Sequence, residues 1–327
     1  MEVRRDLGTG SDNLDMELHS TNEHSGSSCQ QFGIGGVFLR IATRDRSPLV
    51  IDAQHEPFTV DSGCADINVE VQRLPCISPS TQRALFDSGT TWRLCDCGQD
   101  FRFDFGYPLA DQAPAKRLFV DRTYRSATLQ LNSLLLSKFC GRIPPLAYPL
   151  DELLIMHRLT QERAIELHGV GIVGPDGASN LFVGHSGAGK STTARLWTSL
   201  HKVEILSDDR IIVRERPARE LQPDNDPRQI FMYGTPWHGE GCFALPQRAP
   251  LQRIFILEHG HGNVITRLTR SQAVGELFAR AFVPFHRHEY LENALSFLEQ
   301  LVSSVPCYRY SFEPDERAVE KVLQFND

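Results

Sequence analysis

The residues best suited to chemistry in this 327-residue chain form a glycine-rich stretch that matches G-x-x-x-x-G-K-[ST] at every fixed position. Its members are Gly184, His185, Ser186, Gly187, Ala188, Gly189, Lys190 and Ser191, and Thr192 follows directly. Glycines let a backbone fold closely around phosphate oxygens, and amide groups at a helix start attract negative charge. A lysine can neutralise the β- and γ-phosphates, and a serine hydroxyl can bind Mg²⁺. The stretch therefore predicts a nucleoside triphosphate site with Ser191 as a magnesium ligand.

Two adjacent carboxylates, Asp208 and Asp209, follow an apolar run at 203–207. Open α/β sheets bind ligands at the carboxyl ends of their strands. A carboxylate beside bound phosphates can hold Mg²⁺ or accept the proton of an attacking hydroxyl. We expect the two aspartates to divide these roles, with Asp208 as the metal ligand. The alternative is a solvated Asp-Asp-Arg turn. No Asn-Lys-x-Asp motif for guanine follows, so we expect ATP as the nucleotide.

The elements that must position these residues alternate between strand and helix patterns, which favours an α/β layer structure. Apolar runs predict strands at 164–173, 181–184, 203–207, 210–214, 229–234, 252–259 and 307–312. Amphipathic spacing predicts helices at 148–163, 190–200, 271–282, 288–302 and 314–325. The loop thus lies between a strand and a helix, as a phosphate-binding loop requires.

The N-terminal half has a different pattern. Residues 1–30 are polar and aperiodic, which is typical of a disordered tail. Short alternating runs then predict a β-rich domain at 31–147, including a strand at 48–53. Prolines before residue 150 and a helix-like pattern after it place the start of a second domain, 148–327, at residue 148.

Composition excludes several classes of protein. The net charge of −7 argues against bulk binding of nucleic acid. No segment reads as a signal peptide or a membrane-spanning helix, so we expect a cytoplasmic protein with no membrane attachment. The eight cysteines are scattered, which favours reduced thiols. The alternative is a metal or redox pair at Cys95 and Cys97.

Three stretches together carry a family resemblance. They are His168-Gly169-Val170, the 184–191 loop and Ser207-Asp208-Asp209-Arg210. In order and spacing they resemble the catalytic domain of HPr kinase/phosphorylase. A Gly-Thr-Pro-Trp stretch at 234–237 is similar to one in the HPr-kinase-related proteins of bacterial gene clusters. The resemblance implies a P-loop, phosphoenolpyruvate carboxykinase-like mixed-sheet domain, with His168 near the transferred phosphate.

The resemblance further implies that the chain transfers phosphate from ATP to a hydroxyl of a peptide, protein or small metabolite. Asp209 or Asp208 would act as the base, and His168 would position the acidic pair. Thr192 stands where HPr kinases usually carry glutamate, so the acceptor is not expected to be HPr itself. Alternatives are an ATPase or nucleotide-binding regulator, and a carboxykinase-like enzyme. The sequence leaves the oligomeric state open, a homo-oligomer included. Further candidates are His238 and Glu240, to line the acceptor pocket or bind metal, and Arg280, to reach phosphate.

Overall fold

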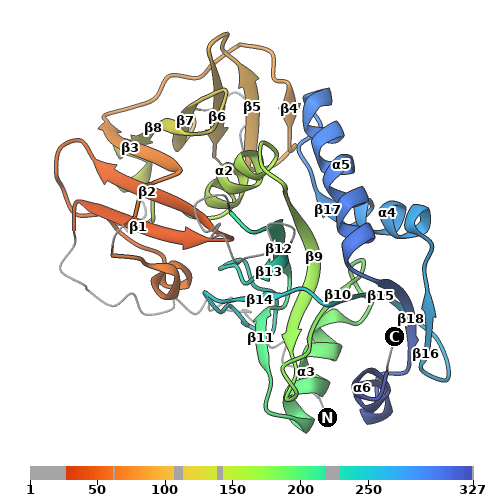
Figure 1. The fold of residues 1–327 in the computed structure, drawn as a ribbon. Coiled ribbons are helices and arrows are strands. Elements are labelled where there is room, and N and C mark those ends of the chain that lie inside the picture. Colours follow the sequence, from red (N-terminus) through yellow and green to blue (C-terminus); the bar gives the residue numbers. More distant parts are fainter. Residues whose placement is uncertain (1–26, 62, 107–112, 138–142, 218–228, 326–327) are drawn as a thin grey trace, which may run out of the picture.

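The fold is known from a computed structural model, which describes residues 27–61, 63–106, 113–137, 143–217 and 229–325. Across these residues the chain is mixed α/β and contains two mixed sheets (Figure 1). Most of the predicted tail, residues 1–26, lies outside the described residues, whereas Cys29 and Gln30 already belong to the first strand.

The first sheet occupies the N-terminal half. Its strands are β1 (Cys29–Ile34), β2 (Val37–Thr43), β3 (Ile67–Leu74), β4 (Phe86–Asp87), β5 (Trp92–Asp96), β6 (Asp100–Phe105), β7 (Lys116–Asp121) and β8 (Ser126–Asn132). Their order is β1-β2-β3-β8-β7-β6-β5-β4. In β3 the alternating side chains of Ile67, Val69 and Val71 are buried, as a half-buried strand requires.

The predicted strand at 48–53 does not form. Asp52 instead caps a 3₁₀ helix, η1 (Ala53–Phe58), by accepting a hydrogen bond from the Gln54 amide. Aspartate readily bonds to an amide two residues ahead, and this local bond competes with pairing in a sheet.

Helix α2 (Leu150–Leu159) lies where the two parts of the chain meet. Its apolar residues Leu150, Leu154 and Ile155 share one buried cluster with Phe32 and Phe103 of the first sheet. The helix also contacts the strand Ala164–Val173 of the second sheet, so it packs against both parts of the chain. A shorter helix, α1 (Ser133–Ser137), follows β8. The cluster also includes Ile212, Tyr233 and Trp237, so the two parts share core.

The second sheet carries the predicted α/β pattern. Its strands are β9 (Ala164–Val173), β10 (Ser179–Val183), β11 (Glu204–Ser207), β12 (Arg210–Glu215), β13 (Ile230–Tyr233), β14 (Arg248–Pro250), β15 (Arg253–His259), β16 (Val264–Arg267), β17 (Ala281–Phe282) and β18 (Cys307–Phe312). Strands β10, β15 and β18 are parallel. Because β11 and β10 are both antiparallel to β9, the carboxyl ends of β11, β10, β15 and β18 lie at one edge.

Strand β9 changes both of its neighbours at one point. Its first half, up to His168, pairs with β12 on one side and β17 on the other. Its second half, from Gly169, pairs with β10 on one side and β11 on the other. The chain therefore leaves the sheet twice at this point: after β10 as the 184–191 loop, and between β11 and β12 at Asp208 and Asp209.

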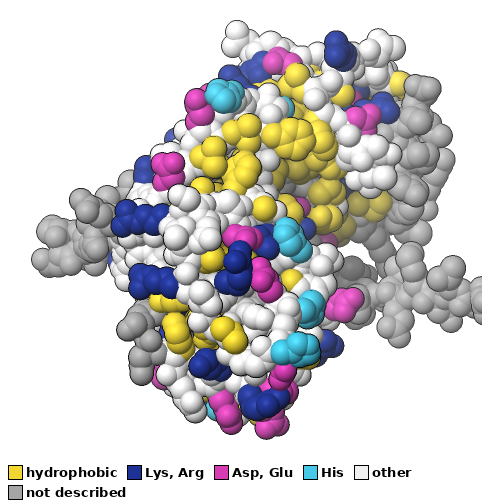
Figure 2. All heavy atoms as spheres, turned by 90° about the vertical axis from the view of Figure 1, so that its right-hand side faces the viewer, with side chains coloured by type: hydrophobic (Ala, Val, Ile, Leu, Met, Phe, Trp, Pro, Cys, Tyr) yellow, Lys and Arg dark blue, Asp and Glu magenta, His cyan; other side chains and the backbone are white. Residues whose placement is uncertain are grey.

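Helices cover both faces of this sheet (Figure 1). Helices α3 (Lys190–Leu200) and α6 (Glu316–Leu323) bury Trp197 and Val319 against one face, with Phe182 and Phe255. Helices α4 (Arg270–Phe278) and α5 (His288–Ser304) bury Leu277 on the other face. Every helix among the described residues is too short or too polar to cross a membrane. On the side of α4 and α5, hydrophobic side chains gather over the upper half of the molecule (Figure 2).

Candidate functional site

The 184–191 loop leaves the sheet between β10 and α3 in a conformation that its glycines permit. Gly187 and Gly189 have φ angles of +79° and +100°, in the left-handed region. A Cβ atom at Gly189 would lie 2.4 Å from the Phe312 ring, so any side chain there would collide with β18. A Cβ atom at Gly187 would meet nothing within 4 Å. The loop therefore rests on β18 at Gly189 and is open at Gly187.

Hydrogen bonds hold the loop to its surroundings at both ends. The Gly184 amide donates to the His168 carbonyl over 3.3 Å. A ring nitrogen of His259, at the end of β15, lies 2.7 Å from the Gly187 carbonyl oxygen. The first bond within α3 runs from the Thr193 amide to the Gly189 carbonyl, over 2.8 Å. The amides at 190–192 precede it and are the unpaired donors found at a helix start.

Lys190 is buried beneath this loop. Its ammonium donates to the carbonyl oxygens of Gly184 and His185, each over 3.0 Å. Burial lowers the pKa of Lys190 to about 8; the negative charge of Asp209 opposes this shift, and the positive charges of Arg210 and Arg280 reinforce it. Ser191 and Thr192 are partly buried in the first turn of α3, and His185 and Ser186 are exposed.

Asp209 lies at the point where β9 changes neighbours. His168 Nε2 is 2.9 Å from Asp209 Oδ1, and the guanidinium of Arg210 pairs with the other carboxylate oxygen. The Gly169 amide donates to the Asp209 carbonyl over 3.1 Å. Burial alone would raise the pKa of Asp209, but the hydrogen bond from His168 and the charges of Arg210 and Lys190 lower it overall. The carboxylate is therefore ionised at neutral pH.

Asp208 has a different environment from its neighbour. It is 2% exposed, and its two carboxylate oxygens accept hydrogen bonds from the amides of Gly239 and Gly241, over 2.8 and 2.7 Å. These bonds fix the loop that follows Gly-Thr-Pro-Trp. A carboxylate has about four lone-pair positions, so a magnesium ion at Asp208 would have to share it with both amides. The geometry leaves Asp209 as the more accessible carboxylate.

A buried layer of acids supports both aspartates, and sequence reasoning missed it. Arg210 Nε donates to Glu152 of α2 over 2.8 Å and lies 3.4 Å from Glu166. Burial, followed by the neighbouring carboxylate of Glu152, raises the pKa of Glu166 well above its usual range. The sequence signal for Glu166 was a single acid inside the apolar strand pattern at 164–173.

Asp151 is the second missed acid. Its Oδ2 accepts a hydrogen bond from Trp237 Nε1 over 2.6 Å and lies 2.8 Å from His55 Nε2. It thereby joins η1, α2 and the loop that binds Asp208. At the sequence level Asp151 and Glu152 indicated only a helix start, because acids are common in first turns.

The weaker candidates lie in varied positions. The Arg280 carbonyl accepts a hydrogen bond from the His168 amide over 2.9 Å. The Arg280 guanidinium pairs with the Glu276 carboxylate over 2.6 Å. His238 and Glu240 are exposed. Within the described residues there is no group of three or more His, Cys, Asp or Glu side chains arranged to hold a metal ion, at Cys95 and Cys97 or elsewhere.

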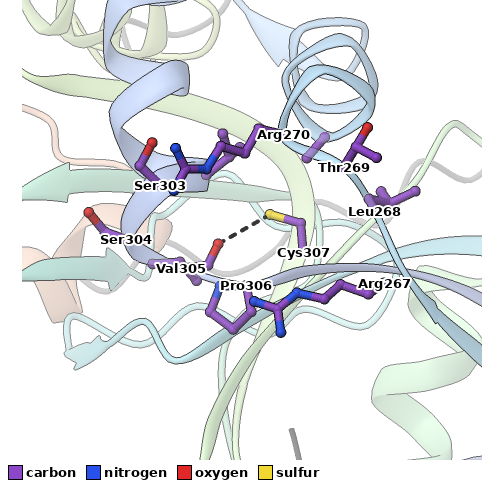
Figure 3. A pocket seen from close by; sticks show the side chains of 11 residues that line it. Arg267, Leu268, Thr269, Arg270, Ser303, Ser304, Val305, Pro306 and Cys307 are labelled. Atoms are coloured by element: carbon purple, nitrogen blue, oxygen red, sulfur yellow. Dashed lines mark hydrogen bonds between the residues drawn. The ribbon is translucent and has the colours of Figure 1, made fainter.

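A cavity of about 310 Å³ lies at the amino end of β18, away from these residues (Figure 3). The side chains of Arg267 and Arg270 lie on two sides of Cys307, whose thiol is 3.5 Å from the Val305 carbonyl oxygen. No residue of the 184–191 loop or of the aspartate pair lines it.

Comparison of the sequence with protein-family models and with curated proteins gives no match.

Proposed function

We propose that this chain is an ATP-dependent kinase that transfers the γ-phosphate to a hydroxyl group. The observation that carries the proposal is the junction on β9. There the His168 carbonyl binds the start of the 184–191 loop, and the Gly169 amide binds the main chain of Asp209. A phosphate-binding loop and an ionised carboxylate are thus held by two consecutive residues of one strand. Phosphoryl transfer depends mainly on such positioning and on charge neutralisation.

The loop supplies the nucleotide end of the proposed site. The amides at the start of α3 and the ammonium of Lys190 would bind the β- and γ-phosphates, since both present positive charge at the loop. Lys190 uses two of its three N–H groups on the carbonyls of Gly184 and His185. The third can point to a phosphate oxygen without loss of either bond.

Asp209 supplies the acceptor end. The acceptor oxygen forms a bond to the γ-phosphorus while the bond from that phosphorus to the oxygen bridging to the β-phosphate breaks. ADP leaves with the electron pair of that bond, and the hydroxyl proton passes to Asp209. The lowered pKa of Asp209 makes it a weak base. Its main contribution is therefore to orient the hydroxyl, and proton transfer follows late, as a loose transition state allows.

Magnesium fits the same residues. Mg²⁺ commonly uses one or two protein oxygens, with phosphates and water completing its shell. The Ser191 hydroxyl and a carboxylate of the aspartate pair would hold it, and Asp209 shares fewer of its lone pairs with backbone amides than Asp208 does. When bound, the ion would neutralise charge on the phosphates.

The resemblance to HPr kinase and its relatives supports the same reaction. The His-Gly strand, the loop and the Asp-Asp-Arg stretch carry the resemblance, and in this chain all three meet at one edge of the second sheet. The resemblance would also make the second part a P-loop, phosphoenolpyruvate carboxykinase-like domain. The Gly-Thr-Pro-Trp stretch adds a contact to the pattern, because the loop after it binds Asp208.

A labelled phosphate tests the proposal. The chain is incubated with γ-labelled ATP, Mg²⁺ and a panel of peptides and small alcohols, and the products are identified by mass spectrometry. We expect label on a hydroxyl of at least one acceptor, and its loss in Lys190→Ala, since that variant removes the only buried cation bonded to the loop among the described residues. Release of labelled phosphate to water alone would favour an ATPase. Unchanged transfer by Lys190→Ala would show that the 184–191 loop is not the nucleotide site.

A further inference from the structure

A second cavity, of about 410 Å³, lies beside the proposed site between the two sheets. It is bounded by β4 and β5 of the first sheet, by α2, and by the segment from β17 to His286. This volume is near the lower end of the range for ligand pockets, about 300–1,000 Å³. Its size suits a single large side chain or a group of similar volume.

The cavity and the proposed site share a wall made of Arg210 and Phe282. The Arg210 guanidinium lies over the Phe282 ring, 4.0 Å from the ring centre, and also pairs with Asp209. The Phe282 ring is 6.1 Å from the ring of His168. A group in the cavity therefore lies only one side chain away from the carboxylate that would orient the acceptor.

The wall of the cavity selects for an uncharged occupant. Its two charged residues, Arg210 and Glu152, are bonded to each other over 2.8 Å. Its two histidines are neutral at pH 7: burial lowers the pKa of His157 to about 3 and that of His286 to about 4, and the positive charge of Arg287 adds to the shift of His286. The remaining side chains are mostly apolar, among them Phe86 and Trp92. Aromatic walls favour an aromatic or large aliphatic group.

The rim of the cavity extends the apolar surface beyond it. Tyr148 is 56% exposed and Phe285 is 65% exposed, and both line the opening. Leu85, next to Phe86, is 47% exposed. The upper half of this side of the molecule carries the hydrophobic side chains seen in Figure 2. A small metabolite would be enclosed by the wall, whereas an exposed apolar rim can contact the residues on either side of a bound side chain.

On the basis of the proposed kinase activity, we propose that this cavity binds an apolar, preferably aromatic, side chain of a polypeptide acceptor. The phosphorylated serine or threonine lies within about two residues of that side chain, because an extended chain advances about 3.3 Å per residue. The cavity thereby places the hydroxyl at Asp209. The substrate class is a hydroxyl-bearing peptide segment with an apolar neighbour.

Peptides with a single serine test this specificity. Alanine-rich peptides with lysine at both ends carry one serine and, at each position up to three residues away, phenylalanine, leucine, alanine or aspartate. Transfer from γ-labelled ATP gives kcat/KM for each. We expect phenylalanine one or two residues from serine to raise kcat/KM at least tenfold over alanine, and aspartate to lower it. Equal rates across the set would overturn the inference while leaving the kinase proposal intact.

A variant of the rim separates recognition from catalysis. Phe285→Ala removes an exposed ring that contacts Phe86 edge-on, so folding is not at risk. We expect about a tenfold rise in KM for the phenylalanine peptide, the size of one lost aromatic contact, with kcat and the KM for ATP unchanged. Leu134→Ala is the matched control, since Leu134 is equally exposed and lies on α1. A tenfold change in the control, or none in Phe285→Ala, would contradict the assignment.

Binding is measured without turnover as well. Trp92 lines the cavity, so its fluorescence reports occupancy by the same peptides, and Trp92→Phe identifies its signal. Saturable quenching by phenylalanine peptides and not by alanine peptides supports the cavity even if no phosphate is transferred. Absence of any peptide-dependent signal overturns it. Light scattering tests whether this surface instead binds a second copy of the chain. If Phe285→Asp dissociates an oligomer and leaves the peptide KM unchanged, the surface is an interface between copies and the inference is wrong.

Discussion

The two cavities differ in what surrounds them, although their volumes are similar, about 310 and 410 Å³. The cavity at the amino end of β18 has two arginines and a cysteine, and among the described residues none of the loop or aspartate side chains reaches it. The cavity between the two sheets is lined by Arg210, which pairs with the Asp209 carboxylate, and that carboxylate also lies against His168. The difference teaches that volume alone does not identify a site. The proposed site rests instead on convergent, mutually bonded groups at the carboxyl ends of strands, which in the described part of the chain lie at the edge that carries the 184–191 loop.

The largest effect expected at that edge comes from Asp209→Asn. The variant keeps the shape of the side chain and removes its charge, so ATP measured without Mg²⁺ should bind within about threefold of the unchanged affinity, because the loop amides and Lys190 still hold the phosphates. Phosphate transfer should fall by about 10²–10⁴-fold, the usual contribution of a positioned acid or base. Single-turnover transfer and equilibrium nucleotide binding measure the two quantities. Full transfer activity in this variant would remove the chemical distinction between the two cavities.

Two controls sharpen the role of Asp209. Asp208→Asn should act on stability, because an amide nitrogen would face the amide of Gly239 or Gly241, and an unmade buried hydrogen bond costs about 1–3 kcal/mol. We expect a fall in Tm of a few degrees. Asp45→Asn is the neutral control: Asp45 also pairs with an arginine, Arg73, over 3.2 Å, but lies on the first part and is exposed. A large loss of transfer in Asp45→Asn would indicate a general effect of charge.

A smaller effect is expected on the pH dependence of nucleotide affinity. It should arise only at the edge of the sheet that carries the 184–191 loop. The pKa of Lys190 is about 8, below its usual 10.5, because of burial. Nucleotide affinity should therefore weaken above pH 8, by up to about tenfold per pH unit, as the ammonium loses its proton. At the other cavity, burial raises the pKa of Cys307 to about 12, so its thiol stays neutral over the same range. Affinity for a non-hydrolysable ATP analogue between pH 7 and 9.5 tests this difference.

As pH rises, the stability of the folded chain should change in the opposite direction to its affinity for nucleotide. This difference provides a check on the role of Lys190. Lys190 has a lower pKa in the folded chain than in the unfolded chain, so the unfolded state binds more protons between about pH 8 and 10.5. Lys116, whose pKa burial also lowers to about 8, contributes in the same direction. Stability without nucleotide should thus rise with pH where nucleotide affinity falls. Constant affinity across the range would exclude Lys190 as the phosphate-binding cation.

Most elements predicted for the second part formed, because their apolar patterns are strong, but the helix predicted at 271–282 ends at Phe278, and Ala281–Phe282 form strand β17 instead. The helix at 190–200 and the strand at 307–312 begin and end as predicted. The short helix α2 also formed, and it packs against both parts of the chain, which its pattern did not specify because an apolar face does not determine which core receives it. The strand predicted at 48–53 failed for a local reason, the cap made by Asp52.

The candidate site was predicted as a set of residues and not as an arrangement. Glycine, lysine and aspartate at these spacings indicate phosphate chemistry, and the structure brings them to one junction on β9. The separate surroundings of Asp208 and Asp209 depend on Gly239 and Gly241, which are distant in sequence, and no local pattern encodes that contact. The acids Asp151, Glu152 and Glu166 were missed because burial, which gives them their role, is a tertiary property.

The smallest effect should come from filling the remote cavity, and it tests the comparison directly. Ser304→Phe places a ring into the cavity at the amino end of β18, where Ser304 is exposed and the fold has room. We expect kcat and both KM values to stay within twofold, because that cavity borders none of the groups that would carry the reaction. Val283→Phe adds a ring to the cavity beside Asp209 and should raise peptide KM several-fold. If Ser304→Phe impaired transfer as strongly as Val283→Phe, both edges of the sheet would take part in function, and confinement of the chemistry to the β9 junction would be wrong.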